Sequence, residues 1–233
     1  YDIWAPLARS VVLQLGFESL AKLTPARAAE VADLMTRASE SAGLSAGDEL
    51  GVKLDLYRVI VWHLLADDRL GSAQADQLKA FRKGFDIWDR DVPVEAKAVE
   101  EFQKLGGVTR EHMPRAEAAL PLGFHEYCIH AARGSLLRAV KQKVDGKRVM
   151  KLVPTEACSL YVTNKRIVVD AKKKIEIPLV KIDDVEVDVD QNVLLVRPAR
   201  GIPQLELQLD DPILSAALID LATNIDERPR GFA

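Results

Sequence analysis

The sequence predicts an α+β protein of two domains, an N-terminal α-helical bundle followed by an antiparallel β-domain that a C-terminal helix closes. Three observations lead to this prediction. The chain has 233 residues, more than the roughly 100 to 150 of a typical single domain. Up to about residue 118 apolar residues recur every three or four positions, the period of helices with one buried face. Beyond residue 136 they occur in short β-branched runs between turn-forming residues, which is typical of strands.

The helices of the first half are bounded by residues that start or stop helices. Thr24 is suited to cap a helix that Pro25 begins and Gly43 ends, and Gly106-Gly107 follows the last helix. We expect helices at about 11–23, 25–43, 48–65, 72–85 and 94–105. Four aromatic residues recur at helical spacing, so we expect core positions rather than a partner groove for Trp62, Phe81, Phe85 and Trp88.

The second half is predicted to be a meander of antiparallel strands. Turn-forming pairs such as Asp145-Gly146 and Gln191-Asn192 separate the β-branched runs. Asp211 and Pro212 then begin a helix with one apolar side. The runs lie at 136–140, 149–153, 159–162, 166–170, 174–178, 182–189, 193–196 and 205–209. The expected organisation is a bundle at 1–118, a linker at 119–135, the β-domain at 136–226 and a tail at 227–233.

Residues 159–169 read Ser-Leu-Tyr-Val-Thr-Asn-Lys-Arg-Ile-Val-Val. This stretch resembles the strand–turn–strand signature of PH-like domains of the GRAM and bacterial PH type, and 175–179 followed by Ile182 is similar to a later strand of that family. The resemblance implies a PH-like antiparallel β-barrel or sandwich with a C-terminal capping helix. It also implies a module that binds phospholipid headgroups or acidic peptides. More weakly, 59–81 resembles the helix–loop–helix of TerB-like bundles.

Charge is distributed unevenly along the chain. The formal net charge of −3 argues against a protein that coats nucleic acid, because that function needs a positive field. The segment 133–174, however, contains twelve lysines and arginines and three acidic residues, a formal charge of +9. The segment from residue 175 onward contains five basic and twelve acidic residues, a formal charge of −7. The basic segment falls on the early strands and their turns.

We therefore expect a non-catalytic adaptor that recognises an anionic ligand, most concretely phospholipid headgroups at a membrane surface. The alternative is a protein–protein interaction scaffold without lipid binding. The partner would be an anionic membrane or an acidic protein, with no nucleic acid, and the location cytoplasmic or peripheral to a membrane. A solvated face whose charges pair with the acidic stretch 183–190 is the competing explanation of the basic residues. The expected ligand-binding residues are Lys141, Lys143, Lys147, Arg148, Lys165, Arg166, Lys172, Lys173 and Lys174.

Metal and enzymatic chemistry are not expected. His125, Cys128 and His130, with Cys158, are possible zinc ligands, but neither strand nor helix spacing brings the first three to one side. Asp67-Asp68 lacks the ligand spacing of a calcium loop. The sequence contains no nucleophile elbow, phosphate-binding glycine loop or paired metal motif. We therefore predict no cofactor and no catalytic residues.

Overall fold

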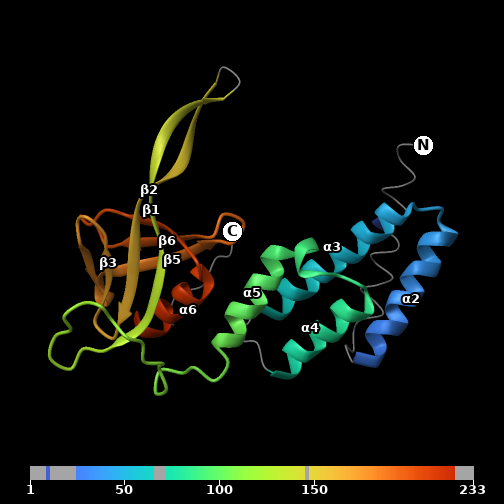
Figure 1. Cartoon of the computed structure of the whole chain (residues 1–233), viewed down its shortest axis with the longest axis horizontal. Helices are drawn as coiled ribbons and strands as arrows, with labels where there is room; N and C mark the ends of the chain where they lie inside the picture. The colour runs from blue at the N-terminus through green and yellow to red at the C-terminus, as the bar shows by residue number, and fades with distance from the viewer. Residues whose placement is uncertain (1–8, 11–24, 66–71, 145–146, 224–233) are drawn as a thin grey trace. The chain divides into compact units, whose positions relative to one another are not determined.

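The computed structural model describes residues 9–10, 25–65, 72–144 and 147–223 (Figure 1). The chain divides into two compact units, Tyr1–Gly106, here the helical unit, and Gly107–Ala233, here the β unit. The architecture is α+β, and the helices precede an antiparallel sheet as the sequence predicts. The predicted helix at 11–23, the Asp67-Asp68 loop, the Asp145-Gly146 turn and the tail at 227–233 lie outside the described residues.

The helical unit begins and ends its helices at the residues that local chemistry favours. Ser45 caps α3, since its hydroxyl oxygen accepts the amide hydrogen of Asp48 at 3.2 Å. Gly43 and Gly107 follow α2 and α5 with φ of +67° and +83°, a conformation that glycine adopts without steric cost. The described helices are α2 (Pro25–Ser41), α3 (Ala46–Leu65), α4 (Ser72–Gly84), a short 3-10 turn (Asp89–Asp91) and α5 (Pro93–Lys104).

Aromatic stacking forms part of the core of this unit. The ring of Phe81 lies 5.9 Å from that of Tyr57 and 4.1 Å from that of Phe85. Phe81 and Phe85 are buried, as predicted, and Trp62 is half-buried. Trp88 was expected in the core, and this prediction is wrong: its side chain is 59% exposed. It follows the end of α4, where the helical period that placed it no longer applies.

The β unit is a seven-stranded antiparallel sheet in the order β4-β3-β2-β1-β7-β6-β5. Its first two strands are far longer than the sequence predicts, because the runs at 149–153 and 159–162 are parts of one strand. The first strand also begins at Cys128, within the expected linker at 119–135. The strands are β1 (Cys128–Val144), β2 (Lys147–Thr163), β3 (Arg166–Asp170), β4 (Ile175–Pro178), β5 (Ile182–Asp188), β6 (Val193–Pro198) and β7 (Leu205–Leu209).

One face of the sheet carries the main core and the closing helix α6 (Pro212–Thr223). Leu160, Ile177, Leu194 and Leu207 are fully buried there with Ile219 of α6. The opposite face has a smaller apolar cluster, in which Cys128, Tyr161 and Val168 pack under alanines and a leucine of the segment 116–120. Adjacent residues of a strand thus supply the two faces alternately.

None of the helices that the structure describes is both long enough and apolar enough to cross a membrane.

Candidate functional site

The structure separates the nine predicted ligand-binding residues into three groups. Lys141, Lys143, Lys147 and Arg148 belong to the β1–β2 hairpin, and Lys165-Arg166 to the turn between β2 and β3. The other three, 172–174, lie between β3 and β4. Because β3 runs between the last two groups, they occupy opposite ends of that strand. The nine residues therefore do not converge on one surface.

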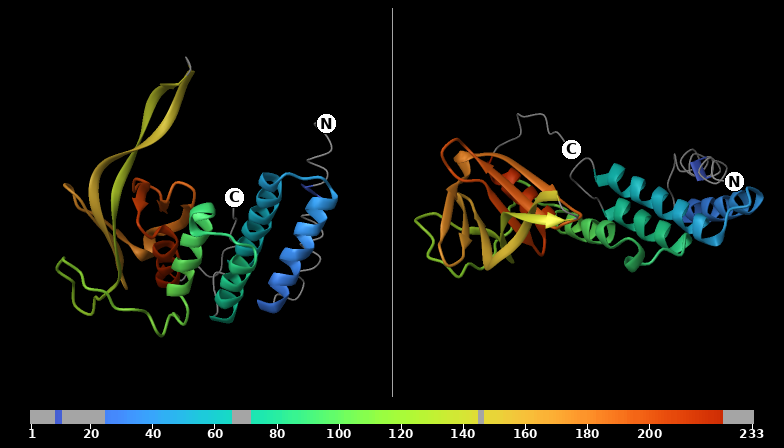
Figure 2. Two further views of the ribbon diagram at one scale, coloured as in Figure 1. Left: turned by 45° about the vertical axis from the view of Figure 1, so that its right-hand side comes forward. Right: turned by 90° about the horizontal axis from the view of Figure 1, so that it is seen from above.

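The outer part of the β1–β2 hairpin is a two-stranded ribbon that leaves the sheet (Figures 1 and 2). β1 pairs with β7 only at Gly134–Leu136, and β2 pairs with β3 only at Ser159–Val162. Residues 137–144 and 147–154 pair only with each other, and we call them the arm. A β-bulge at the root of the arm, between Leu136 and Leu137, holds an additional residue of β2, Thr155. Its hydroxyl donates to the Leu136 carbonyl at 3.0 Å.

The arm is the most basic element of the chain. Its sequence holds six lysines and arginines, Arg138, Lys141, Lys143, Lys147, Arg148 and Lys151, and no acidic residue outside the connecting Asp145-Gly146. Arg138, Lys141 and Lys151 are exposed, as is Met150. The backbone register pairs Lys143 with Arg148 and Val144 with Lys147 at the far end.

The group between β3 and β4 is a local loop surface. Lys172 and Lys173 are exposed, whereas Lys174 forms an ion pair with Glu176 at 2.8 Å. Exposed pairs of this kind contribute about 0 to 1 kcal/mol. These residues are suited to keeping an edge of the sheet soluble.

The remaining group, Lys165-Arg166, has a structural role. It belongs to the turn at 163–166, which we call the clamp turn, and this turn holds a loop that lies about 40 residues earlier in the chain. The Asn164 side chain accepts the amide hydrogen of Tyr127 and donates to the carbonyl of His125, both at 3.0 Å. Lys165 donates through Nζ to the carbonyl of Phe124 at 2.6 Å. We call residues 123–127 the clamped loop.

Glu126 is the centre of this clamp. Its carboxylate is 3% exposed and receives two hydrogen bonds from Arg166, at 2.8 and 3.1 Å, and one from the hydroxyl of Thr163 at 2.9 Å. It also accepts the amide hydrogen of Gly123 at 2.7 Å. Burial acts to raise the pKa of Glu126, but the hydrogen bonds from Arg166, Gly123 and Thr163 outweigh it, so this pKa lies below its usual value. Arg166, which also pairs with Glu176, is therefore engaged within the protein.

The clamped loop presents an apolar side chain to solvent. Phe124 is 84% exposed, and its ring touches only that of His125, edge to face, among the aromatic contacts of the described residues. The 3-10 turn Leu179–Lys181 lies beside the same clamp, since the Leu179 amide donates to the Lys165 carbonyl at 3.0 Å. That turn exposes 92% of Val180. Phe124 and Val180, with the partly exposed Leu122, form what we call the apolar edge.

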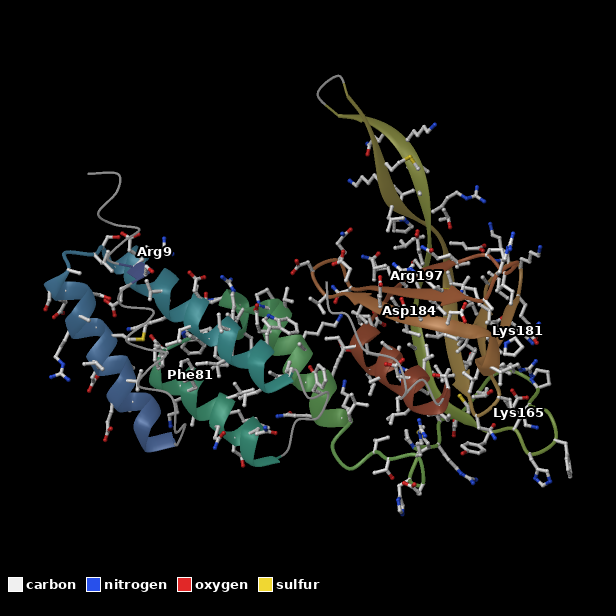
Figure 3. The ribbon with its side chains drawn as sticks, turned by 180° about the vertical axis from the view of Figure 1, so that it is seen from behind. Arg9, Phe81, Lys165, Lys181, Asp184 and Arg197 are labelled. Carbon is white, nitrogen blue, oxygen red and sulfur yellow. The ribbon has the colours of Figure 1, made fainter. Side chains whose placement is uncertain are left out.

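Lysines flank the apolar edge. The side chains of Lys165 and Lys181 are exposed, and Figure 3 shows both at the same border of the β unit. Of these residues only Lys165 was predicted as a ligand-binding residue. Sequence reasoning missed Phe124, Val180 and Lys181. A phenylalanine after Pro-Leu-Gly was a signal of an exposed turn residue, but its fixed position depends on Glu126 and the clamp turn.

Two acidic residues of the stretch 183–190 pair within the sheet rather than with the predicted basic residues. Asp184 and Glu186 on β5 pair with Arg197 of the neighbouring β6, and Figure 3 labels Asp184 and Arg197. Arg197 donates to Asp184 and Glu186 at 2.7 Å each. These two carboxylates therefore bind a basic residue outside the predicted set.

The candidate metal ligands are dispersed. Cys128 and Cys158 are free and buried on opposite faces of the sheet, while His125 is exposed. His130 contacts Ser215 at 3.1 Å and Asp211 at 3.4 Å, both through the same ring nitrogen, Nε2. A catalytic triad needs the acid and the nucleophile on different nitrogens, and Ser215 is fully buried. This cluster therefore joins α6 to β1. The described residues include no group of three or more metal-ligating side chains.

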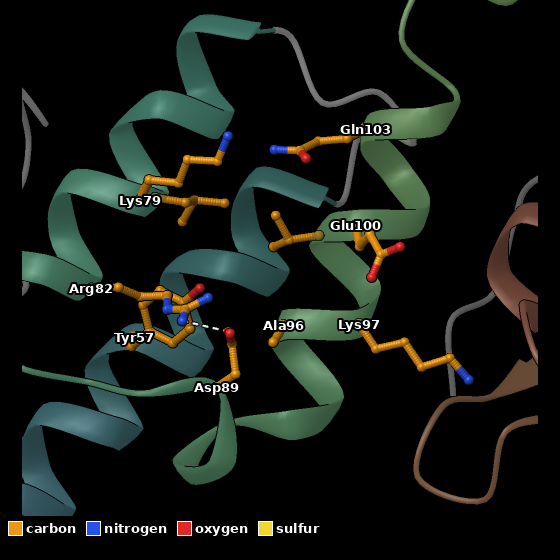
Figure 4. A pocket seen from close by; sticks show the side chains of 10 residues that line it. Tyr57, Lys79, Arg82, Asp89, Ala96, Lys97, Glu100 and Gln103 are labelled. Carbon is orange, nitrogen blue, oxygen red and sulfur yellow. Dashed lines mark ion pairs between the residues drawn. The ribbon is translucent and has the colours of Figure 1, made fainter.

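The helical unit contains a cavity of about 430 Å³ between α3, α4 and α5 (Figure 4). Its charged groups are largely paired: Arg82 with Asp89, and Glu100 with Lys104 at 3.1 Å. Burial raises the pKa of Tyr57 in its wall to about 12, so this phenol stays protonated. No paired acid and base suited to catalysis meet in the cavity.

In a comparison with known proteins, no family model matches the chain, and no curated protein matches it.

Proposed function

We propose that the β unit is a PH-like, non-catalytic module that attaches to anionic membrane surfaces through its apolar edge. The observation that carries the proposal is the clamped loop. Five hydrogen bonds made by side chains of the clamp turn fix this loop, in which Phe124 is 84% exposed. A rigid loop that presents an aromatic residue loses little conformational entropy when that residue is buried on binding.

The combination of apolar and basic side chains favours a membrane as the partner. Burying a Phe or Val side chain contributes roughly 1.5 to 3 kcal/mol. Each Lys near an anionic bilayer adds about 1 kcal/mol. Phe124 and Val180 would enter the interface, while Lys181 would remain at the level of the headgroups.

Three features support the PH-like assignment of the β unit. The strands are antiparallel and consecutive except where β1 meets β7, a helix follows the last strand, and that helix packs on the main core. The Thr-Asn-Lys-Arg stretch that carries the resemblance forms the clamp turn between β2 and β3. In this protein its polar residues hold the clamped loop.

Co-sedimentation with vesicles tests the function. The vesicles are phosphatidylcholine alone or phosphatidylcholine with phosphatidylserine, each at two salt concentrations. The unaltered chain is expected to bind the anionic vesicles. In Phe124→Ser/Val180→Ser the partition coefficient should fall about tenfold or more, because about 1.4 kcal/mol corresponds to a factor of ten. Lys181→Glu should weaken binding in a salt-dependent manner.

Matched variants control for hydrophobicity and charge. Met150→Ser removes another exposed apolar side chain, 61% exposed on the arm, and Lys173→Glu makes the charge change of Lys181→Glu elsewhere. Both should bind as the parent does. Equal binding by Phe124→Ser/Val180→Ser and the parent would reject the apolar edge as the site. No binding to any vesicle would reject the membrane and leave the protein–protein scaffold.

A further inference from the structure

The arm concentrates positive charge in a way that the overall negative charge of the chain conceals. Its sequence has six basic residues, and the arm pairs with no other strand of the sheet. An isolated two-stranded ribbon is at best marginally stable in water. An element of this kind gains most from a partner that supplies opposite charge.

The register of the arm places basic residues on both of its faces. Residues directly opposite each other in an antiparallel pair share a face, and the faces alternate along each strand. Lys141 is paired with Met150, whereas Val140 is paired with Lys151 and Arg138 with Val153. Lys141 therefore lies on one face, and Arg138 and Lys151 lie on the other.

Because basic residues lie on both faces of the arm, a membrane and a nucleic-acid duplex would contact the arm differently. A flat membrane would meet one face of the ribbon and leave the cations of the other face in water. The groove of a nucleic-acid duplex has phosphates along both walls, beside the edges of an inserted ribbon, so long side chains of both faces can reach negative charge. The major groove of B-form DNA, about 12 Å wide, admits a two-stranded antiparallel ribbon. The corresponding groove of A-form RNA is too deep and narrow.

We propose that the arm binds double-stranded DNA by lying in its major groove, with lysines and arginines of both faces against the phosphates. The eight residues at 137–144 extend about 26 Å at roughly 3.3 Å per residue. That length reaches across the duplex groove. The contacts are to phosphates, so affinity depends on salt and little on sequence. This inference does not depend on the membrane proposal.

Fluorescence anisotropy with a labelled 20-base-pair DNA duplex tests the proposal over a series of salt concentrations. If the three exposed residues Arg138, Lys141 and Lys151 contact phosphates, the logarithm of the binding constant should fall with the logarithm of salt concentration with a slope of about −3 or steeper. In Lys141→Glu/Lys151→Glu, which alters one cation on each face, affinity at low salt should fall at least about tenfold, and the slope should become less negative by about two.

The control variant is Lys172→Glu/Lys173→Glu, which makes the same charge change at two exposed residues outside the arm. It should keep most of the affinity and the same slope. Equal losses in both variants would show a response to net charge alone and overturn the proposal. Failure of the unaltered chain to bind the duplex at low salt would also overturn it, as would arm-dependent binding to anionic vesicles but not to DNA.

The DNA proposal and the membrane proposal can be rejected independently of each other. Phe124→Ser/Val180→Ser leaves the arm unchanged and should bind the duplex as the parent does. Conversely, Lys141→Glu/Lys151→Glu leaves the apolar edge unchanged and should retain the binding to vesicles that depends on Phe124 and Val180.

Discussion

Arg166 is a residue for which the sequence predicted ligand binding, whereas the structure shows a role in stabilising the fold. In the sequence Arg166 belongs to the basic segment 133–174 and was expected to bind an anionic ligand. In the structure it binds Glu126, which lies 40 residues earlier in the chain. Such a pairing depends on tertiary contact and has no local pattern. The same limit concealed Phe124, whereas a turn between the strand runs 159–162 and 166–170 was predicted from the sequence and is present.

Replacing Arg166 tests this structural role. In Arg166→Ala the Glu126 carboxylate, only 3% exposed, loses both hydrogen bonds from the guanidinium. Removing one partner of a buried pair costs several kcal/mol. Because Arg166 is partly exposed, we expect the free energy of unfolding to fall by about 2 kcal/mol, measured by urea denaturation. Lys173→Ala should change it by less than about 0.5 kcal/mol. Similar values for the two variants would contradict the clamp.

The lowered pKa of Glu126 leads us to predict that the stability of the protein depends on pH. This pKa is lowered in the folded protein from 4.5, so the clamp contributes full stability above about pH 4.5. That contribution is lost as pH falls through the folded pKa. Calorimetric unfolding between pH 6 and pH 3 should show a smaller acid-induced loss of stability in Glu126→Gln than in the parent. Parallel pH curves for the two proteins would exclude this contribution.

Gly134 on β1 is required by close packing. A Cβ atom there would lie 2.0 Å from the backbone oxygen of Gln208 on β7. Gly134→Ala must therefore separate the two strands, at a cost of about 2 kcal/mol or more in the free energy of unfolding. Gly47→Ala is the matched control, since its Cβ would meet only ordinary contact in α3 and alanine favours helices. Thermal denaturation should show a lower midpoint for Gly134→Ala alone.

At the scale of elements, local periodicity predicted the helices better than the long strands. Starts such as Pro25 and Ser72 and stops such as Gly43 were visible because capping chemistry is local. β1 and β2 each run through residues with low strand preference, among them Gly134 and Pro154. Pairing across the hairpin keeps these residues in the strands, so the sequence suggested interruptions where the structure has none.

The arm and the sheet should differ in dynamics, although β1 and β2 run through both. Amides of the arm belong to a ribbon without a third strand, whereas residues 159–162 pair on both sides and lie over the core. Hydrogen exchange followed by mass spectrometry should therefore be much faster in 147–154 than in 159–162. Addition of the DNA duplex should slow exchange in the arm. Equal protection of the two segments in the free protein would show that the arm is not an independent element.

At the scale of the whole molecule, the sequence predicts an uneven distribution of charge that the net charge hides. The structure separates the +9 and −7 segments only in part: Arg197 pairs with acids of β5, whereas Arg166 and Lys174 pair with Glu176. What the sequence could not supply was the division of the basic residues into three groups. That division follows from strand order and from the length of β2.

The length of β2 has a further consequence. The arm and the clamp turn lie on one continuous strand, and the residues between them, 155–162, span about 26 Å at roughly 3.3 Å per residue. A duplex bound by the arm and a bilayer bound by the apolar edge would thus be joined through a single strand that is paired within the sheet.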